Sequence, residues 1–108
     1  MIAISGNDNA SETVRVSALT TETLTANDFV LYMKAVTGNA TVNLPAVALT
    51  QPGRPYTIVK DGAAFTVTLD GSGSETINGA TTNVLASGAF HGVTVVNTGT
   101  EWIIRSTY

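Results

Sequence analysis

The chain has 108 residues, no cysteine and a formal net charge of −3 at neutral pH. A chain of this length is expected to form one domain with an apolar core of its own. The lack of cysteine excludes disulfides and thiolate metal sites. The five Lys and Arg residues are scattered along the sequence. Because nucleic-acid binding needs a concentrated positive surface, we expect no nucleic-acid partner.

Charged residues make up only 12% of the chain, compared with about 25% in an average domain. Thr, Asn, Ser and Gly must therefore cover much of the surface, and a surface of this kind loses its water at little cost. Depletion of charge is a property of interface cores. We therefore expect an oligomer or a protein docked on a larger assembly; the alternative is a monomer with a Thr-rich surface.

Residues 1–12, MIAISGNDNASE, begin with a short apolar tip and become polar. They are predicted to form an N-terminal arm that precedes a single β-domain at 13–108. The arm is either a free terminus or a segment that pairs with a neighbouring subunit or a host surface, with Ile2 and Ile4 as anchors. No secretory signal and no apolar run of about 18 residues is present, so we expect no membrane partner.

Alternating and apolar runs predict several strands in the first half of the chain. Strands are expected at 13–18, 29–36 and 40–44, whereas 20–25 fits either a strand or a turn. The run at 29–36 follows Asp28, which is a suitable helix cap, but its Phe, Val and Tyr residues favour a strand. Pro45 ends the strand at 40–44 because proline cannot donate to a sheet ladder.

Residues 55–69, PYTIVKDGAAFTVTL, contain two alternating runs joined by Asp61-Gly62, a dipeptide typical of tight hairpin turns. The sequence therefore predicts a hairpin with two different faces. The apolar face, expected in the core, consists of Tyr56, Ile58, Phe65, Val67 and Leu69. The second face, expected at a subunit interface, includes Thr57, Val59, Thr66 and Thr68.

Two further hairpins are expected towards the C-terminus. Asn78-Gly79 predicts one tight turn, and runs at 91–96 and 101–107 flank another turn at 97–100, with a short strand at 83–86 before them. Trp102 is expected in the core because aromatic side chains bury a large area. The frequent turn signals predict an all-β fold with about eight or nine short strands. The expected form is a single compact antiparallel β-sandwich or small barrel, jelly-roll-like in its connections.

Residues able to support catalysis are few. His91 is the one histidine, and no serine lies in a nucleophile-elbow context, so we expect no catalytic residue and no enzyme activity. The loop at 70–75 places Asp70 and Glu75 among hydroxyls and carbonyls, which suits either a calcium ion or a solvated turn. Two acidic ligands are too few for a tight calcium site, so we expect no metal ion and no cofactor.

The order of motifs in residues 41–108 resembles the small β-domains of tailed-bacteriophage virion proteins. These domains occur at the ends of tail fibres and in head decoration (cement) proteins. The resemblance rests on pattern more than on invariant chemistry. The motifs that carry it are TVNLP at 41–45, GRPYTIVKDG at 53–62, FTVTLDG at 65–71, ETING at 75–79 and VTVVNTGTEWII at 93–104.

The resemblance implies a virion structural protein, commonly a homotrimer, without enzyme activity and without catalytic residues to carry over. Tail-fibre domains usually end long chains, whereas this chain is short and starts with its own Met1. We therefore expect a capsid decoration protein that binds the shell of the major capsid protein and stabilises the assembled head. Its location would be the outer capsid surface of the virion, after synthesis in the bacterial host cytoplasm. The alternative is a tail-fibre or receptor-binding tip domain that engages host-surface carbohydrate.

Overall fold

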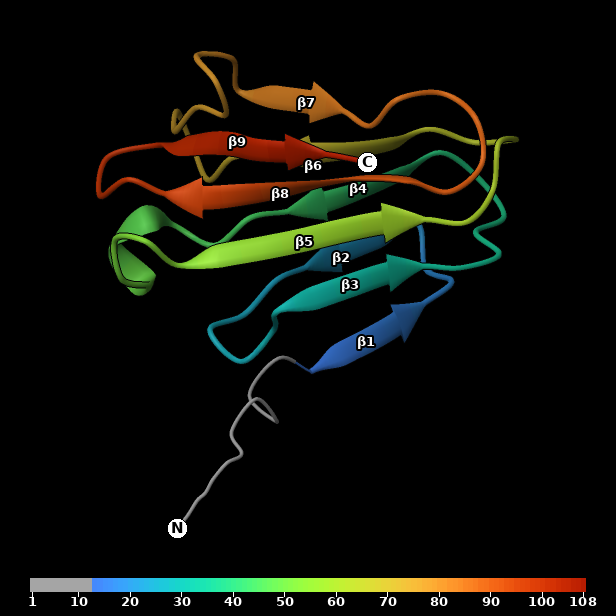
Figure 1. Cartoon of the computed structure of the whole chain (residues 1–108), viewed down its shortest axis with the longest axis horizontal. Coiled ribbons are helices and arrows are strands. Elements are labelled where there is room, and N and C mark those ends of the chain that lie inside the picture. The colour runs from blue at the N-terminus through green and yellow to red at the C-terminus, as the bar shows by residue number, and fades with distance from the viewer. Residues whose placement is uncertain (1–12) are drawn as a thin grey trace, which may run out of the picture.

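A computed structural model describes residues 13–108, which form two β-sheets that face each other (Figure 1). The five-stranded sheet has the order β1-β3-β5-β8-β9, and the four-stranded sheet has the order β2-β4-β6-β7. The strand bounds are β1 Val14–Ser17, β2 Thr21–Thr23, β3 Val30–Met33, β4 Ala40–Asn43, β5 Pro55–Lys60, β6 Val67–Asp70, β7 Thr82–Val84, β8 His91–Asn97 and β9 Trp102–Thr107. One helical turn, η2 (Val47–Leu49), follows β4. The expected all-β class and strand number are confirmed.

The first six strands alternate between the two sheets, so that the chain winds in coils. Strands β1, β3 and β5 pair in parallel in one sheet, and β2, β4 and β6 pair in parallel in the other. Each coil contains one strand of each sheet: β1 with β2, β3 with β4, and β5 with β6. Stacked coils of this kind are the arrangement of solenoid proteins. The expectation of an antiparallel, jelly-roll-like sandwich or barrel is therefore wrong, because four strand pairs are parallel.

The prediction of a hairpin with its turn at Asp61-Gly62 is also wrong. Strand β5 lies between β3 and β8, so both of its edges are already paired, and β6 belongs to the opposite sheet. A type I′ turn needs positive φ at both central residues, and neither Asp61 nor Gly62 has it. The Asp61 carboxylate instead accepts a hydrogen bond from the Ala35 amide at 3.0 Å. Residues 61–66 therefore carry the chain across from one sheet to the other.

The last three strands are antiparallel to their neighbours and close the stack. Strand β7 pairs with β6, β8 pairs with β5, and β9 pairs with β8 after the turn at 98–101. The hairpin predicted at 91–107 is therefore confirmed. Asn78 and Gly79 have φ values of 51° and 87° and lie within an Ile77–Ala80 bridge, so the second tight turn is also confirmed.

The core fills the space between the two sheets. Alternation along each strand turns every second side chain inward, and the inward residues of both sheets form one apolar cluster around Trp102 and Tyr56. The rings of these two residues pack edge to face, and their centres are 5.6 Å apart. The expected core position of Trp102 is confirmed, as are those of Tyr56, Ile58, Val67 and Leu69. Phe65 is the exception, at 36% exposed, because it lies in the crossing segment before β6 begins.

No helix in residues 13–108 is long and apolar enough to span a membrane. The N-terminal arm predicted at 1–12, including Ile2 and Ile4, lies outside the described residues.

Candidate functional site: the outer face of the five-stranded sheet

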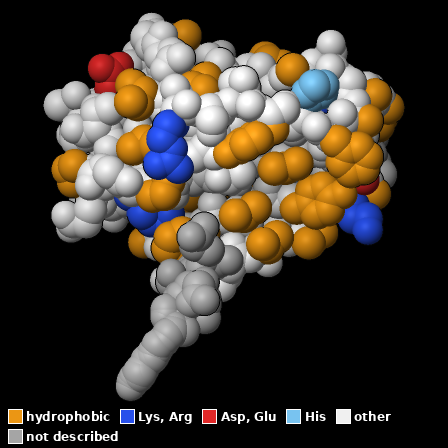
Figure 2. Space-filling model, in the orientation of Figure 1, with side chains coloured by type: hydrophobic (Ala, Val, Ile, Leu, Met, Phe, Trp, Pro, Cys, Tyr) orange, Lys and Arg blue, Asp and Glu red, His pale blue; other side chains and the backbone are white. Residues whose placement is uncertain are grey.

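The outer face of the five-stranded sheet is largely apolar. In β3, Leu31 and Met33 point into the core, so Val30 and Tyr32 point outward. The strand register carries this outward row across the sheet. We call these residues the outer face: Val14, Val16, Val30, Tyr32, Thr57, Val59, Thr94, Val96, Ile103 and Ser106. Figure 2 shows apolar side chains gathered over this sheet with few charges between them.

Charge is scarce on the outer face because the charged strand residues of this sheet mostly point elsewhere. Arg15 and Lys60 align with the inward-facing Leu31 and Met33. Arg105, in the irregular part of β9, is the one Lys or Arg of these strands that is exposed. Val14 and Val16 are 60% and 58% exposed, although each lies in a strand. Exposed apolar side chains that are neighbours on one face of a sheet are a feature of interaction surfaces.

A row of hydroxyl groups crosses the same face. The Thr57 and Thr94 hydroxyl oxygens are 2.8 Å apart, and Thr94 Oγ1 lies 2.9 Å from the Tyr108 hydroxyl. The Ser106 hydroxyl donates to the Tyr108 hydroxyl at 3.0 Å. Because these groups satisfy one another, covering them with a partner leaves few polar atoms without a hydrogen bond.

The interface residues predicted from the sequence are divided between the two sides of the molecule. Thr57 and Val59 lie in the middle of the outer face. Thr68 pairs with Thr41 and Val84 on the outward side of the four-stranded sheet, and Thr66 is exposed just before β6. The structure therefore does not bring the four residues together, because the predicted hairpin does not form. A role of either group in an interface stays a prediction.

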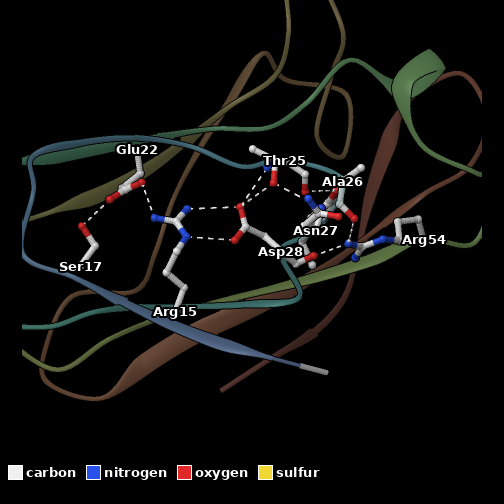
Figure 3. A network of polar contacts seen from close by, with 9 residues as sticks. Arg15, Ser17, Glu22, Thr25, Ala26, Asn27, Asp28 and Arg54 are labelled. Carbon is white, nitrogen blue, oxygen red and sulfur yellow. Dashed lines mark hydrogen bonds and ion pairs between the residues drawn. The ribbon is translucent and has the colours of Figure 1, made fainter. Parts of the chain in front are cut away.

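A charged network closes the first coil, where β1 and β2 are the outermost strands of the two sheets within residues 13–108 (Figure 3). The Arg15 guanidinium contacts Glu22 at 2.7 Å and Asp28 at 2.9 Å, and the Ser17 hydroxyl donates to Glu22. Glu22 and Asp28 are both buried, each residue being 8% exposed. Inward-pointing charge on an edge strand opposes pairing with another strand. This network was not predicted from the sequence, because its residues come from separate segments that only the fold brings together.

The carboxylates of this network stay ionised in spite of their burial. Burial by itself would raise the pKa of Glu22, but hydrogen bonds from Ser17 and Arg15 outweigh burial and lower that pKa below 4.5. Burial likewise acts to raise the pKa of Asp28, and hydrogen bonds from Arg15 and Thr25 lower it below 3.8. The Arg15 pKa is raised by the same hydrogen bonds, with Asp28 contributing most.

A second arginine fastens the loop between β2 and β3. The Arg54 guanidinium lies 3.9 Å from the centre of the Phe29 ring and 4.1 Å from that of the Tyr56 ring. It also donates to the carbonyl oxygens of Ala26 and Asp28, as Figure 3 shows. Cation–π contact and backbone hydrogen bonds together use the planar fork of arginine. Arg54 therefore has a structural role that its position in the sequence did not indicate.

His91 and Glu75, which were considered for catalysis and for metal binding, have structural partners. His91 Nδ1 lies 2.8 Å from the Tyr108 carbonyl oxygen. Glu75 accepts a hydrogen bond from the Val47 amide at 3.0 Å and so holds η2. Within the described range 13–108, no group of three or more His, Cys, Asp or Glu residues is placed to hold a metal ion.

A scan against protein-family models finds no match to this chain, and a search of the curated proteins finds no significant match.

Proposed function

We propose that this protein is a phage virion structural protein that decorates the capsid, and that it docks through the outer face of the five-stranded sheet. One observation carries the proposal. Each of the five strands of that sheet contributes outward side chains that are apolar or hydroxylic. Arg15 aligns with the inward-facing Leu31, so Arg105 is the one arginine of these strands that is not aligned with the core side. A surface of this composition is easily desolvated by a protein partner.

Decoration stabilises a shell by binding the assembled state. A protein that contacts several capsid subunits at once binds the shell but not the separated subunits, and this difference favours the shell by mass action. A homotrimer would bind through three copies of the same weak contact, and the overall affinity would then exceed that of a single contact. The short coiled fold supplies a rigid sheet for such contacts, since both edges of β3, β5 and β8 are paired.

The proposal is tested by mixing the protein with assembled heads and with unassembled capsid subunits of the phage that encodes it. Sedimentation should recover the protein with heads only, and decorated heads should release their DNA at a higher temperature than bare heads. Light scattering after gel filtration measures the trimer separately. Equal binding to heads and to free subunits would contradict a decorating role.

A tail-fibre tip is the second candidate, and exposed aromatic residues favour it. Phe90 is 68% exposed and Tyr108 is 58% exposed, and His91 beside Phe90 contacts the Tyr108 carbonyl. Exposed aromatic rings are suited to stacking on sugars. Binding to host-surface polysaccharide that is lost in Phe90→Ala, without binding to heads, would support this candidate over decoration.

A further inference from the structure

A small recess opens where the chain crosses from β5 to β6. Its volume is about 120 Å³. The connection after β3 forms one wall and the crossing segment 61–66 forms the other. Five of the lining residues are apolar: Ala35, Val36, Ala64, Phe65 and Val67. The remaining wall consists of Lys60, the last residue of β5, and of Asp61 and Gly62, which follow it.

Lys60 is an unusual residue to find in this place. It is 2% exposed, and its position in β5 turns it inward beside Ile58 and Tyr56. Within residues 13–108, both ion pairs belong to Arg15, so no carboxylate there lies at ion-pair distance from the Lys60 amino group. A desolvated ammonium without an anionic partner costs free energy.

Lys60 belongs to the lining of the recess. In the described part of the chain, Trp102 Nε1 is the one side-chain nitrogen or oxygen that is both sealed from solvent and without a hydrogen bond. Lys60 Nζ is therefore not both sealed and unpartnered, and within residues 13–108 it forms no ion pair. The recess is the open space that this side chain lines. This opening offers a partner for the ammonium a way to approach it.

The rim of the recess is built in advance. Ala35 has a φ of 57°, which is rare for a residue with a side chain. The Asp61 carboxylate holds it there by accepting the Ala35 amide hydrogen at 3.0 Å. This bond joins the two walls, because Ala35 follows β3 and Asp61 follows β5. A pre-formed, mostly apolar recess with a few polar groups, here Lys60 and Asp61, is the usual form of a small-ligand site.

We propose that this recess binds a carboxylate carried on a short aliphatic chain. The carboxylate pairs with the Lys60 ammonium, and the chain contacts Val36, Phe65 and Val67. An apolar cavity of about 150 Å³ admits benzene, so a recess of about 120 Å³ takes a chain of four or five carbons. A free short-chain acid and the side chain of a partner's glutamate share this chemistry.

The test is an NMR titration of the isotope-labelled full chain with sodium salts of acids from acetate to octanoate. Pentanoate should shift the signals of Ala35, Ala64 and Val67 in a saturable way, with a Kd of about 1 mM. Affinity should rise from acetate to pentanoate and then level, since longer chains extend beyond the recess. Pentylamine, which has the same chain and the opposite charge, should give no saturable shift.

Two variants separate the ammonium from the shape of the recess. Lys60→Met should weaken pentanoate binding at least tenfold while the signals of β8 and β9 keep their positions. Ala64→Phe should fill the recess while Lys60 stays in place, and should abolish pentanoate binding. This variant still tests the binding site if Lys60→Met does not fold. Ala48→Phe, on the exposed side of η2, is the control and should bind as the original chain does.

A glutamate blocked at both ends distinguishes the two sources of the carboxylate. Tighter binding of this compound than of pentanoate indicates a partner's side chain, and the reverse order indicates a free acid. Shifts that do not saturate with either compound, or equal affinities of pentanoate for the original chain and Lys60→Met, would overturn the proposal.

Discussion

Arg15 allows two carboxylates to be buried in the first coil. Its side chain is 39% exposed and contacts both Glu22 and Asp28, whose side chains are 9% and 11% exposed. Removing the cation leaves two neighbouring negative charges with little access to water, and this is more costly than losing a surface ion pair.

We therefore expect Arg15→Met to lower the free energy of unfolding by about 2 kcal/mol, a value reduced from that of a fully buried pair because water reaches Arg15. Urea unfolding followed by tryptophan fluorescence measures the change through Trp102. Arg105→Met, at an exposed arginine of β9, is the matched control and should change stability by less than about 0.5 kcal/mol. Equal effects of the two substitutions would show that the network does not stabilise the fold.

The same carboxylates predict how stability depends on pH. Their pKa values are lower in the folded chain than the ordinary values of 4.5 for Glu22 and 3.8 for Asp28. The unfolded chain therefore takes up protons first as the pH falls, so stability is present above those ordinary values and is lost below them. The melting temperature should be constant from about pH 7 to 5 and should fall below about pH 4.

The double variant Glu22→Gln, Asp28→Asn isolates this effect. Its melting temperature should be lower than that of the original chain at neutral pH but should change less between pH 5 and pH 3. If both proteins lose stability in parallel over this range, other carboxylates cause the acid sensitivity.

Single strands were predicted more accurately than their pairing. The alternation of apolar residues located β3, β4 and β5 within a few residues, because each turns one side towards the core. The partners of a strand depend on contacts across the whole chain, and Asp61-Gly62 suggested a local partner that β3 and β8 exclude. A weak signal of the coils is present in the sequence: Thr21, Thr41 and Thr68 align in register. Unequal loops between the coils hide this repeat.

The pairing of β5 with β8 can be tested at a glycine. A Cβ on Gly92 would lie 2.5 Å from the Ile58 carbonyl oxygen and 3.1 Å from Val59 Cα, so the backbones of the two strands would have to separate. Gly92→Ala should therefore lower the free energy of unfolding by about 3 kcal/mol. Gly62→Ala is the control, because a Cβ there meets nothing within 4 Å and the φ is not positive.

Thermal unfolding compares these two glycine variants under identical conditions. In the hairpin predicted from the sequence, Gly62 is the turn residue that needs positive φ, and Gly62→Ala would be the harmful substitution. The coiled topology predicts the opposite order. A larger loss in Gly62→Ala than in Gly92→Ala would contradict the strand arrangement.

For the molecule as a whole, the low charge of the sequence predicted a protein with partners. It did not predict which surface would contact them. Thr57 and Val59 were selected correctly as outward residues, since alternation alone separates them from Tyr56 and Ile58. The apolar residues Val14, Val16 and Ile103 were not selected, because which side of an edge strand is exposed depends on the opposite sheet. The Lys60 recess also depends on two loops that are distant in the sequence.

We propose that the outer face of the five-stranded sheet, and not the opposite face, contacts the capsid. Val16 and Val84 are well matched for a test of this proposal: they are 58% and 55% exposed and lie in edge strands on opposite sides of the molecule. A glutamate at either position stays in water in the free protein, so neither fold should suffer. Only at a buried interface does the new charge lose its water without a partner.

The decisive measurement is the affinity of three proteins for assembled heads, determined by co-sedimentation over a range of protein concentrations. The original chain and Val84→Glu should bind with the same affinity, and Val16→Glu should bind at least tenfold more weakly, which corresponds to about 1.4 kcal/mol. Unchanged binding of Val16→Glu, or a loss confined to Val84→Glu, would contradict the assignment of the outer face as the docking surface.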